Sequence, residues 1–427
     1  MLHRCMLALA LLLPSQSAFA AVSYKWDVSL ETLDFLLHRE DFTINDQETL
    51  ASAFTLKYDD EKHFQLLLKP RVRIDFLDPE RNRYLPNESF FKIYGDQTEF
   101  AAGLQLRSWG VSNSFNPTDM INRKDYGDNF FIPEKLGDVI VSLKHTLPKV
   151  GAFEDVSMEF LALPWFLETP MPSVDSRFAV AGTVSGLSFT RYDVQDDPDL
   201  LESLGAGLRV AGSIKGWDTE LLFYHGPEKQ PTFFMLIDPS LNLRAVPFYY
   251  LVDMVGTNIS KSAGAFVLHL ESAFKITELN AVKNHAVPFT TTDVIPNNYW
   301  QFVPGIDFTQ DGVFGGGTLV WTLEYLGEDD VGVIFEEFRP FKSDVFFGFR
   351  YEFNNTRLMR FQAGVMKDVL NQEMVIQTQF HTNLVKGLGL DFESVVLNQD
   401  SDANAPMSLF ANNSYLGLNL NYSLCGN

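Results

Sequence analysis

The chain contains very little cysteine. Its 427 residues include 2 cysteines. Cys5 lies in an N-terminal segment that we expect to be removed, and Cys425 lies near the C-terminal end. One remaining thiol cannot form an internal disulfide, which excludes a small secreted domain stabilised by disulfides.

Long apolar runs and basic residues are also scarce. Beyond the N-terminal segment, no stretch reaches the roughly 18 consecutive apolar residues that a membrane-spanning helix needs. Lys and Arg number 33 against 55 Asp and Glu, which gives a formal net charge of −22. A chain this acidic is a poor partner for nucleic acid.

Catalytic and metal-binding signatures are missing as well. The 8 histidines include no His-x-x-x-His pair, and the chain has neither a Gly-x-Ser-x-Gly elbow nor a phosphate-binding loop. The acidic clusters Asp196–Asp199 and Glu328–Asp330 lack the spacing of a calcium loop. We therefore expect no catalytic residues, no bound metal, no cofactor and no enzymatic activity.

The first 20 residues have the organisation of a secretory signal peptide. A short basic start (Met1–Arg4) precedes an apolar run (Leu7–Leu13) and a small-x-small cleavage site at Ala18–Ala20. The apolar run is too short to span a bilayer. We predict a signal peptide over residues 1–20 and a mature chain from Ala21. The alternative, a buried N-terminal helix, would normally carry polar residues on one side.

Strict alternation of apolar and polar residues dominates the rest of the chain. In Asp344–Phe353 one face consists of Val, Phe, Phe, Tyr and Phe, and the other of Asp, Phe, Gly, Arg and Glu. Tyr415–Tyr422 and Thr318–Tyr325 alternate in the same way. A two-residue period indicates β-strands that have one apolar and one polar face.

The length and number of these segments favour a membrane barrel. Strands of about 10 residues, tilted by about 40°, rise about 25 Å, which matches the apolar band of an outer-membrane barrel. Aromatic residues, 14% of the chain, gather at strand ends as in interfacial girdles. We predict an all-β, antiparallel, up-and-down transmembrane β-barrel of about 16–18 strands formed by residues 21–427. The alternative is a soluble β-sandwich, whose strands also alternate.

Short polar turns alternate with long connections along the chain. Asn354–Thr356 and Asp368–Asn371 are examples of the former, and Ser112–Gly137 and Gly226–Val246 of the latter. In a large barrel, long loops cover the outer mouth or fold into the lumen. We expect residues 112–137 to form a lumen constriction or a plug.

One segment carries a resemblance to a known family. Leu104–Tyr126 reads LQLRSWGVSNSFNPTDMINRKDY, in which Arg107-Ser108-Trp109-Gly110 ends a strand and Asn116-Pro117-Thr118-Asp119 forms a turn. This resembles a porin-like family of Gram-negative outer-membrane proteins of unassigned function, within the alginate-export-like or substrate-specific porin class. A second turn of that pattern, Asn122–Asp125, has arginine where the family commonly has proline. The resemblance implies an outer-membrane barrel.

The same segment supplies the candidate site. The face of Arg107 is opposite to the apolar face of its strand, so its side chain points into the lumen of a barrel. Opposed charges at a narrow neck orient polar solutes. The candidate constriction residues are Arg107, Trp109, Asn116, Asp119, Asn122, Arg123 and Asp125. In the alternative interpretation, the same residues tie a plug loop to the barrel wall through ion pairs.

A second set of charges is expected on inward strand faces. These residues form the candidate lumen charge network: Arg350, Glu352, Arg360, Asp391 and Glu393. Lumen charges commonly pair with one another, so a structural network is the first interpretation. The other is a basic ladder for anionic solutes.

Together these features predict a channel in the cell outer membrane for passive diffusion of small hydrophilic solutes. The alternative is a plugged structural or binding barrel whose outer loops engage a partner or the cell surface. The expected partners are outer-membrane lipid and lipopolysaccharide, a small hydrophilic solute and, in one arrangement, two further copies of the chain in a homotrimer.

Overall fold

The fold was analysed in a computed structural model of the 427-residue chain. The structure describes residues 22–40, 42–60, 62–179, 181–184, 187–191, 204–237, 243–278, 298–329, 341–370, 373–398, 410 and 412–426. The predicted signal peptide, residues 1–20, lies outside the described residues.

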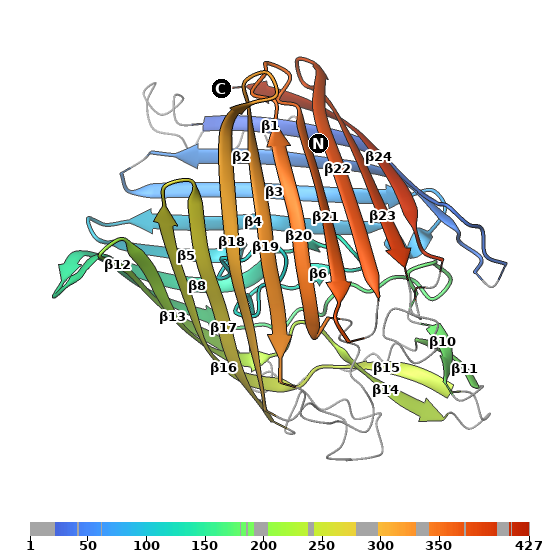
Figure 1. The fold of residues 1–427 in the computed structure, drawn as a ribbon, viewed down its shortest axis with the longest axis horizontal. Helices are drawn as coiled ribbons and strands as arrows, with labels where there is room; N and C mark the ends of the chain where they lie inside the picture. The colour runs from blue at the N-terminus through green and yellow to red at the C-terminus, as the bar shows by residue number, and fades with distance from the viewer. Residues whose placement is uncertain are drawn as a thin grey trace, which may run out of the picture.

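Eighteen antiparallel strands form one closed barrel (Figure 1). Each strand pairs with the next barrel strand along the chain, and β24 pairs with β1 to close the sheet. The predicted all-β barrel of 16–18 strands is therefore confirmed. The barrel strands are β1 (Val22–Phe35), β2 (Asp46–Asp59), β3 (Phe64–Asp75), β4 (Arg83–Tyr94), β5 (Thr98–Gln105), β8 (Asp138–Val150), β9 (Phe153–Leu163), β12 (Gly205–Ile214), β13 (Trp217–Pro227), β16 (Leu251–Ala263), β17 (Phe266–Glu278), β18 (Tyr299–Val313), β19 (Gly317–Glu328), β20 (Ser343–Glu352), β21 (Arg360–Asp368), β22 (Met374–Val385), β23 (Leu388–Asn398) and β24 (Tyr415–Gly426).

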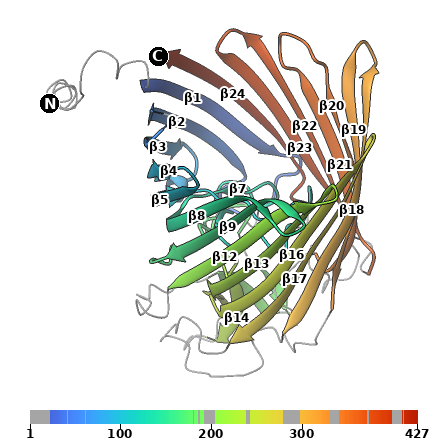
Figure 2. The ribbon, with the colours of Figure 1, turned by 90° about the vertical axis from the view of Figure 1, so that its left-hand side faces the viewer.

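The two rims of the barrel differ in the length of their connections. On the rim where β1 begins and β24 ends, tight turns join the strands (Figure 2). In the Lys215-Gly216 turn both residues have positive φ, 51° and 76°, as a type I′ hairpin requires. The opposite rim carries the long connections, among them residues 106–137 between β5 and β8. Because outer-membrane barrels keep short turns on the periplasmic side, the long-loop rim is the outer one.

The outward faces form an apolar belt. On β20, Val345 and Phe347 are 37% and 49% exposed, whereas inward-facing Asp344 is 1% exposed. Aromatic side chains are exposed at both ends of the belt, for example Trp26 near the periplasmic rim and Trp300 at the start of β18. This distribution is the one that a lipid-facing barrel surface requires.

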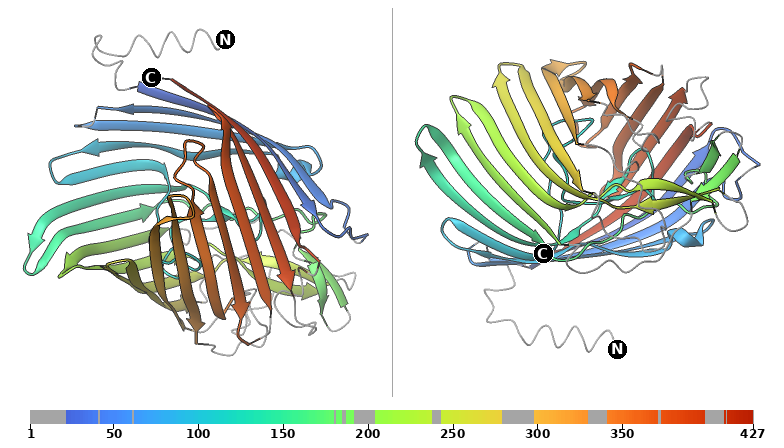
Figure 3. Two further views of the ribbon diagram at one scale, coloured as in Figure 1. Left: turned by 45° about the horizontal axis from the view of Figure 1, so that its top comes forward. Right: turned by 90° about the horizontal axis from the view of Figure 1, so that it is seen from below.

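Smaller sheets do not belong to the barrel wall. Two connections of the outer rim form a four-stranded sheet from β10 (Ala181–Val184), β11 (Leu187–Arg191), β14 (Thr232–Ile237) and β15 (Leu243–Phe248). Figure 3 shows this sheet at one end of the barrel. Inside residues 106–137, β6 (Lys124–Asp125) pairs with β7 (Glu134–Lys135). Among the described residues, no helix is long and apolar enough to cross a membrane; a 3₁₀ helix spans Pro79–Arg81.

The structure corrects several expectations for individual strands. Alternation predicts a barrel strand near Thr183–Asp193, but β11 belongs to the small outer sheet. Alternation does not predict strand β4, because its residues Phe90 and Phe91 are adjacent and interrupt the two-residue period. Pro70 sits at a register shift between β3 and β4, where the missing N–H is tolerated. The last strand is longer than expected, since it includes Cys425 and Gly426.

Candidate functional site

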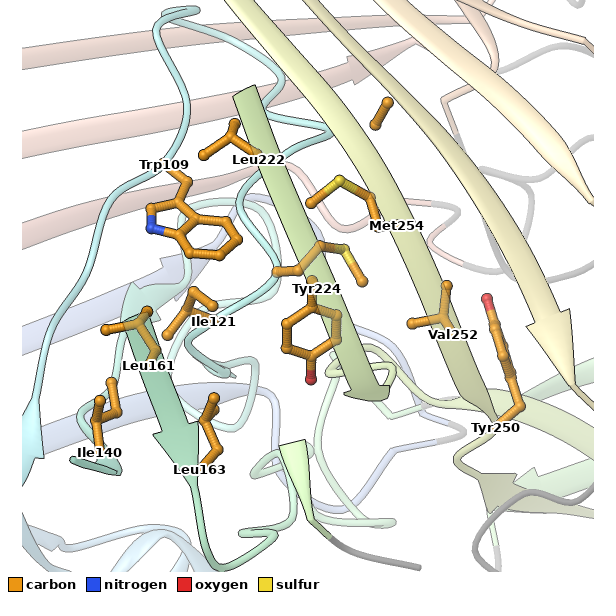
Figure 4. Packing of buried hydrophobic residues seen from close by; sticks show 12 residues of the cluster. Trp109, Ile121, Ile140, Leu161, Leu163, Leu222, Tyr224, Tyr250, Val252 and Met254 are labelled. Carbon is orange, nitrogen blue, oxygen red and sulfur yellow. The ribbon is translucent and has the colours of Figure 1, made fainter. Parts of the chain in front are cut away.

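Residues 106–137 lie inside the barrel, and their first half packs on one side of the wall. Trp109 and Ile121, 1% and 0% exposed, contact inward-facing side chains of β8, β9, β13 and β16 in one buried apolar cluster (Figure 4). The wall residues of the cluster are Ile140, Leu161, Leu163, Leu222, Tyr224, Val252, Met254 and Ala273, and Tyr250, which directly precedes β16, packs with them. Inward-facing apolar side chains on these strands therefore bind the loop rather than line an open pore.

Two glycines let the loop come close to the wall. A Cβ atom at Gly207 of β12 would lie 2.7 Å from Cη2 of Trp109. A Cβ atom at Gly256 of β16 would lie 2.8 Å from Cγ2 of Thr118. Both distances are too short for real contacts, so only glycine fits at these positions.

Glu271 of β17 holds the loop by its backbone. Its carboxylate accepts hydrogen bonds from the N–H groups of Val111 (2.9 Å), Ser112 (3.2 Å) and Thr118 (2.9 Å). The Thr118 hydroxyl donates a fourth bond at 2.8 Å. The Glu271 side chain is fully buried, and several N–H donors can compensate the burial of its charge.

Glu324 of β19 forms a second attachment next to the first. It accepts hydrogen bonds from the N–H groups of Asn113 (2.6 Å) and Ser114 (2.8 Å), and from the Ser114 hydroxyl. Nε2 of His269 lies 3.0 Å from the same carboxylate. Gly305 leaves room for the His269 ring, which a Cβ atom there would overlap. The two glutamates thus fix residues 111–118 to the wall.

Arginines of β3 and of the following 3₁₀ helix hold the middle of the loop. Arg73, which is buried, contacts Asp125 at 2.9 Å and Asp128 at 2.7 Å. Arg81 contacts Asp128 at 2.8 Å, and Arg71 pairs with Glu134. These charges connect the loop to the side of the barrel that its first half does not touch.

The charge pairs affect the two aspartates differently. Burial raises the pKa of Asp125, although the neighbouring Arg73 opposes this shift. Burial also acts on Asp128, but there the charges of Arg73 and Arg81 outweigh it and lower the pKa. Asp128 is therefore the ionised partner that both guanidinium groups share.

A second apolar cluster holds the far end of the loop. Phe130 packs with Phe410 at a ring-centroid distance of 4.4 Å, and both contact inward-facing side chains of β1 and β22–β24. The cluster also contains Leu33, Phe178, Val375, Val395 and Tyr415. Since the first half of the loop packs on β8–β17, residues 106–137 cross the whole lumen.

The structure places most of the predicted constriction residues in local pairs within the loop and its wall. Arg107 contacts Glu159 of β9 at 3.2 Å. Asp119 pairs with Lys135 across the loop, and burial lowers the pKa of Arg123. The side chain of Arg123 donates a hydrogen bond to the backbone oxygen of Glu168 at 2.9 Å.

The remaining candidates divide into buried and lumen-facing positions. Trp109 and Asp125 are buried in the contacts described above. Asn122 is also buried, and it accepts a hydrogen bond from the Arg107 N–H and donates one to the Gln105 carbonyl. Asn116 lines an open space beside the loop. The structure therefore brings these residues into one loop but not around one aperture.

The residues of the predicted lumen charge network face the lumen from β20, β21 and β23. Arg350 pairs with Glu352 at 3.3 Å. Asp391 pairs with His381 at 2.6 Å, and Glu393 accepts a hydrogen bond from Asn129 of the loop at 3.0 Å. Arg360 is exposed and lines a lumen space. Four of these five residues thus have a partner in the wall or the loop, and Arg360 is exposed to the lumen space.

The described residues outline two spaces beside the loop. The smaller, of about 330 Å³, lies between β1–β3 and β21–β24 and is lined by charged groups that include Arg71, Asp128, Arg360 and Glu393. The larger, of about 580 Å³, lies between the loop and β17–β22. Its charged lining residues are Lys124, Lys275, Asp307 and Arg350. Among the described residues, no group of three His, Cys, Asp or Glu side chains could hold a metal ion.

Sequence reasoning missed the residues that hold the loop. Glu271 and Arg73 occupy inward positions of alternating strands, and alternation alone gives them the same status as every other lumen-facing residue. Alternation places Glu271 on the inward face of its strand together with His269, Ala273 and Lys275, and it gives no signal that singles Glu271 out. Their partners in the loop lie about 50 to 160 residues away in the chain.

Comparison with known proteins gives structural similarity only. No protein-family model matches the chain, and no curated protein matches it in sequence. Among solved structures, Wzi of Escherichia coli, described as an outer membrane protein involved in Group 1 capsule assembly and a carbohydrate-binding β-barrel, has a TM-score of 0.53 at 9% identity, covering 96% of this chain and 85% of Wzi.

Two further structures show the same architecture. OccAB3 of Acinetobacter baumannii has a TM-score of 0.52 at 12% identity, covering 95% of this chain and 100% of OccAB3. A BenF-like porin of Pseudomonas fluorescens Pf-5 has a TM-score of 0.50 at 10% identity, covering 95% and 98% of the two chains. The shared fold is that of porin-like outer-membrane β-barrels. The Arg-Ser-Trp-Gly motif and the alginate-export-like class remain predictions.

Proposed function

We propose that this protein is an outer-membrane channel for small hydrophilic solutes, narrowed by residues 106–137. The observation that carries the proposal is the space of about 580 Å³ between the loop and β17–β22. Polar side chains of both the loop and the wall line it, as a path for hydrated solutes requires. The same loop bonds that narrow the lumen keep this space at a fixed width.

In this proposal the loop residues have two roles. Arg107, Asp119 and Arg123 give the loop its shape through their local pairs. Asn116 and Lys124 face the solute path.

Residues 1–20 act as the leader that directs the chain out of the cytoplasm.

A specific observation favours a second candidate, the plugged binding barrel. The loop is attached to opposite sides of the wall through two apolar clusters, two glutamates and three arginines. A loop held on all sides can also close a lumen. The similarity to Wzi is compatible with this candidate, because that barrel is described as binding carbohydrate.

Single-channel recording distinguishes the two candidates. Purified protein in a planar bilayer should give stable conductance steps, and a reversal potential in asymmetric salt should report the sign of the permeant ion. A folded, heat-modifiable barrel that never conducts would reject the channel and favour the plugged barrel. The double variant Arg107→Ala/Arg123→Ala should conduct with more current noise, because the loop loses two of its local bonds.

A further inference from the structure

An aromatic ring lies flat on the wall of the larger lumen space. Phe346 of β20 points inward, and it lines this space together with the glycine pair Gly348 and Gly364 of β20 and β21. A Cβ atom at Gly348 would lie 2.7 Å from Cζ of Phe346, and one at Gly364 would lie 2.6 Å from its Cε2. One face of the ring therefore covers the two glycines, and the other face is left toward the lumen.

An apolar ring face is unusual in a path for hydrated solutes. Removing aromatic surface from water lowers the free energy. A ring face that borders a polar space therefore favours a ligand with a flat apolar surface. Phe115 of the loop and Phe341 add an aromatic pair to the same space, with ring centroids 5.5 Å apart. Apolar contact is thus available on both the wall and the loop.

Side-chain amides are the most frequent polar groups in the rest of the lining. Seven Asn and Gln residues border the space: Asn113, Asn116, Gln230, Gln301, Gln362, Gln377 and Gln379. An amide both donates and accepts hydrogen bonds, and so does a hydroxyl group, whereas a carboxylate or phosphate only accepts. Two of the three cations in the lining are paired with carboxylates, Lys275 with Glu228 at 3.8 Å and Arg350 with Glu352 at 3.3 Å. An anionic solute would also leave amide carbonyls without donors, which costs free energy in a narrow space. Gln362 already donates to Gln379, and Gln377 donates to the Phe131 carbonyl. A solute rich in hydroxyls can satisfy the amide donors and acceptors that remain.

A pyranose ring combines these two requirements. Its ring faces present C–H groups, and its rim presents hydroxyls. We propose that the larger lumen space binds a neutral saccharide, with one pyranose ring stacked on Phe346 and its hydroxyls bonded to the amides of β21 and β22 and to Arg350. A volume of about 580 Å³ is in the usual range of small-ligand sites, roughly 300–1,000 Å³. This proposal deepens the channel function and rests on it.

The experiment is current block by cellotriose in a planar bilayer, with polyethylene glycol of equal mass as the control solute without ring faces. Cellotriose should block the wild-type current with saturable kinetics, and polyethylene glycol should not. Phe346→Leu keeps an apolar side chain but removes the flat face, so its affinity for cellotriose should fall roughly threefold to tenfold. Phe346→Tyr keeps the ring and should bind as the wild type does.

Two more variants make the test specific. Phe347→Leu changes the next residue of β20, which faces lipid and is 49% exposed, and it should leave the block unchanged. Gly364→Ala places a Cβ atom against the ring and should weaken the block even if Phe346→Leu does not fold. Unchanged affinity in the folded variants Phe346→Leu and Gly364→Ala would overturn the proposal, as would block by phenylacetate but not by cellotriose.

The channel and the saccharide site fail in different ways. A barrel that conducts ions without saturable block by cellotriose overturns the saccharide site and leaves the channel. A barrel that does not conduct overturns the channel, and calorimetric titration of the detergent-solubilised protein with cellotriose then decides whether the saccharide site exists.

Discussion

The attachment of the loop by Glu271 gives a quantitative prediction. The carboxylate receives two donors on each oxygen: the Thr118 N–H and hydroxyl on one, and the Val111 and Ser112 N–H groups on the other. In Glu271→Gln, one oxygen remains and the other becomes an NH₂ group. That group is a donor. Toward Val111 and Ser112 it would face two N–H groups, and toward Thr118 it would face one N–H and a hydroxyl that can turn to accept.

The variant thus loses one or two of the four hydrogen bonds to a charged acceptor, and an uncharged oxygen accepts the others. Each such bond contributes about 1.5–3 kcal/mol, and relaxation of the loop recovers part of the loss. We expect the free energy of opening residues 111–118 to fall by about 2–4 kcal/mol. At roughly 1.4 kcal/mol per factor of ten, local amide exchange should accelerate about thirtyfold to several hundredfold.

Hydrogen–deuterium exchange of the detergent-solubilised barrel measures this directly in peptides that cover residues 106–137. Glu352→Gln is the matched control, because Glu352 also faces the lumen but pairs with Arg350 of its own strand. Exchange of residues 111–118 in Glu271→Gln that matches the rate in Glu352→Gln would refute the attachment. Faster exchange over the whole barrel would instead indicate global destabilisation.

Three further predictions concern the other contacts. Trp109→Ala should lower the free energy of unfolding in urea by about 3–5 kcal/mol, as large-to-small changes in a core do; a loss below about 1 kcal/mol would contradict the buried packing. Arginines lower the pKa of Asp128 against the effect of burial. Its ion pairs therefore stabilise the loop fully above the pKa of about 3.9 that Asp has in the unfolded chain. This stabilisation is lost as the pH falls through the lower pKa that Asp128 has in the folded protein. The difference in loop exchange between wild type and Asp128→Asn should therefore shrink below about pH 4, and a difference that persists to about pH 2 would be inconsistent with these ion pairs. Arg360→Gln should shift the reversal potential toward the value for cation selectivity, whereas Arg357→Gln in a periplasmic turn should not. Equal reversal potentials in the two variants would show that ions do not pass through the smaller space.

The position of the loop determines how the barrel can act. A lumen crossed by a mobile loop would open and close with the loop, but here charged, apolar and backbone contacts hold residues 106–137 on opposite sides. A fixed loop makes pore width a property of side chains. Selectivity in such a channel should therefore respond to point substitutions at lining residues such as Lys124 and Phe346 more than to changes in loop length.

The sequence by itself determined the barrel. Period-two alternation in segments such as Tyr415–Tyr422 defines which side chains face lipid, because each strand of a membrane barrel must present an apolar face to the bilayer. Strand length and strand number follow from bilayer thickness and chain length. The alternation of Tyr24, Trp26, Val28 and Leu30 in β1 carries the same information.

Only the tertiary structure decided what fills the barrel. Glu271 and Arg73 look like ordinary lumen-facing residues, and their roles come from loop atoms that lie about 50 to 160 residues away in the chain. The position of the Phe346 ring likewise depends on Gly364 of the next strand, because a side chain at that position would overlap the ring. Alternation reports the direction of a side chain but not its partner, because partners across a closed lumen are set by the path of the loop in three dimensions.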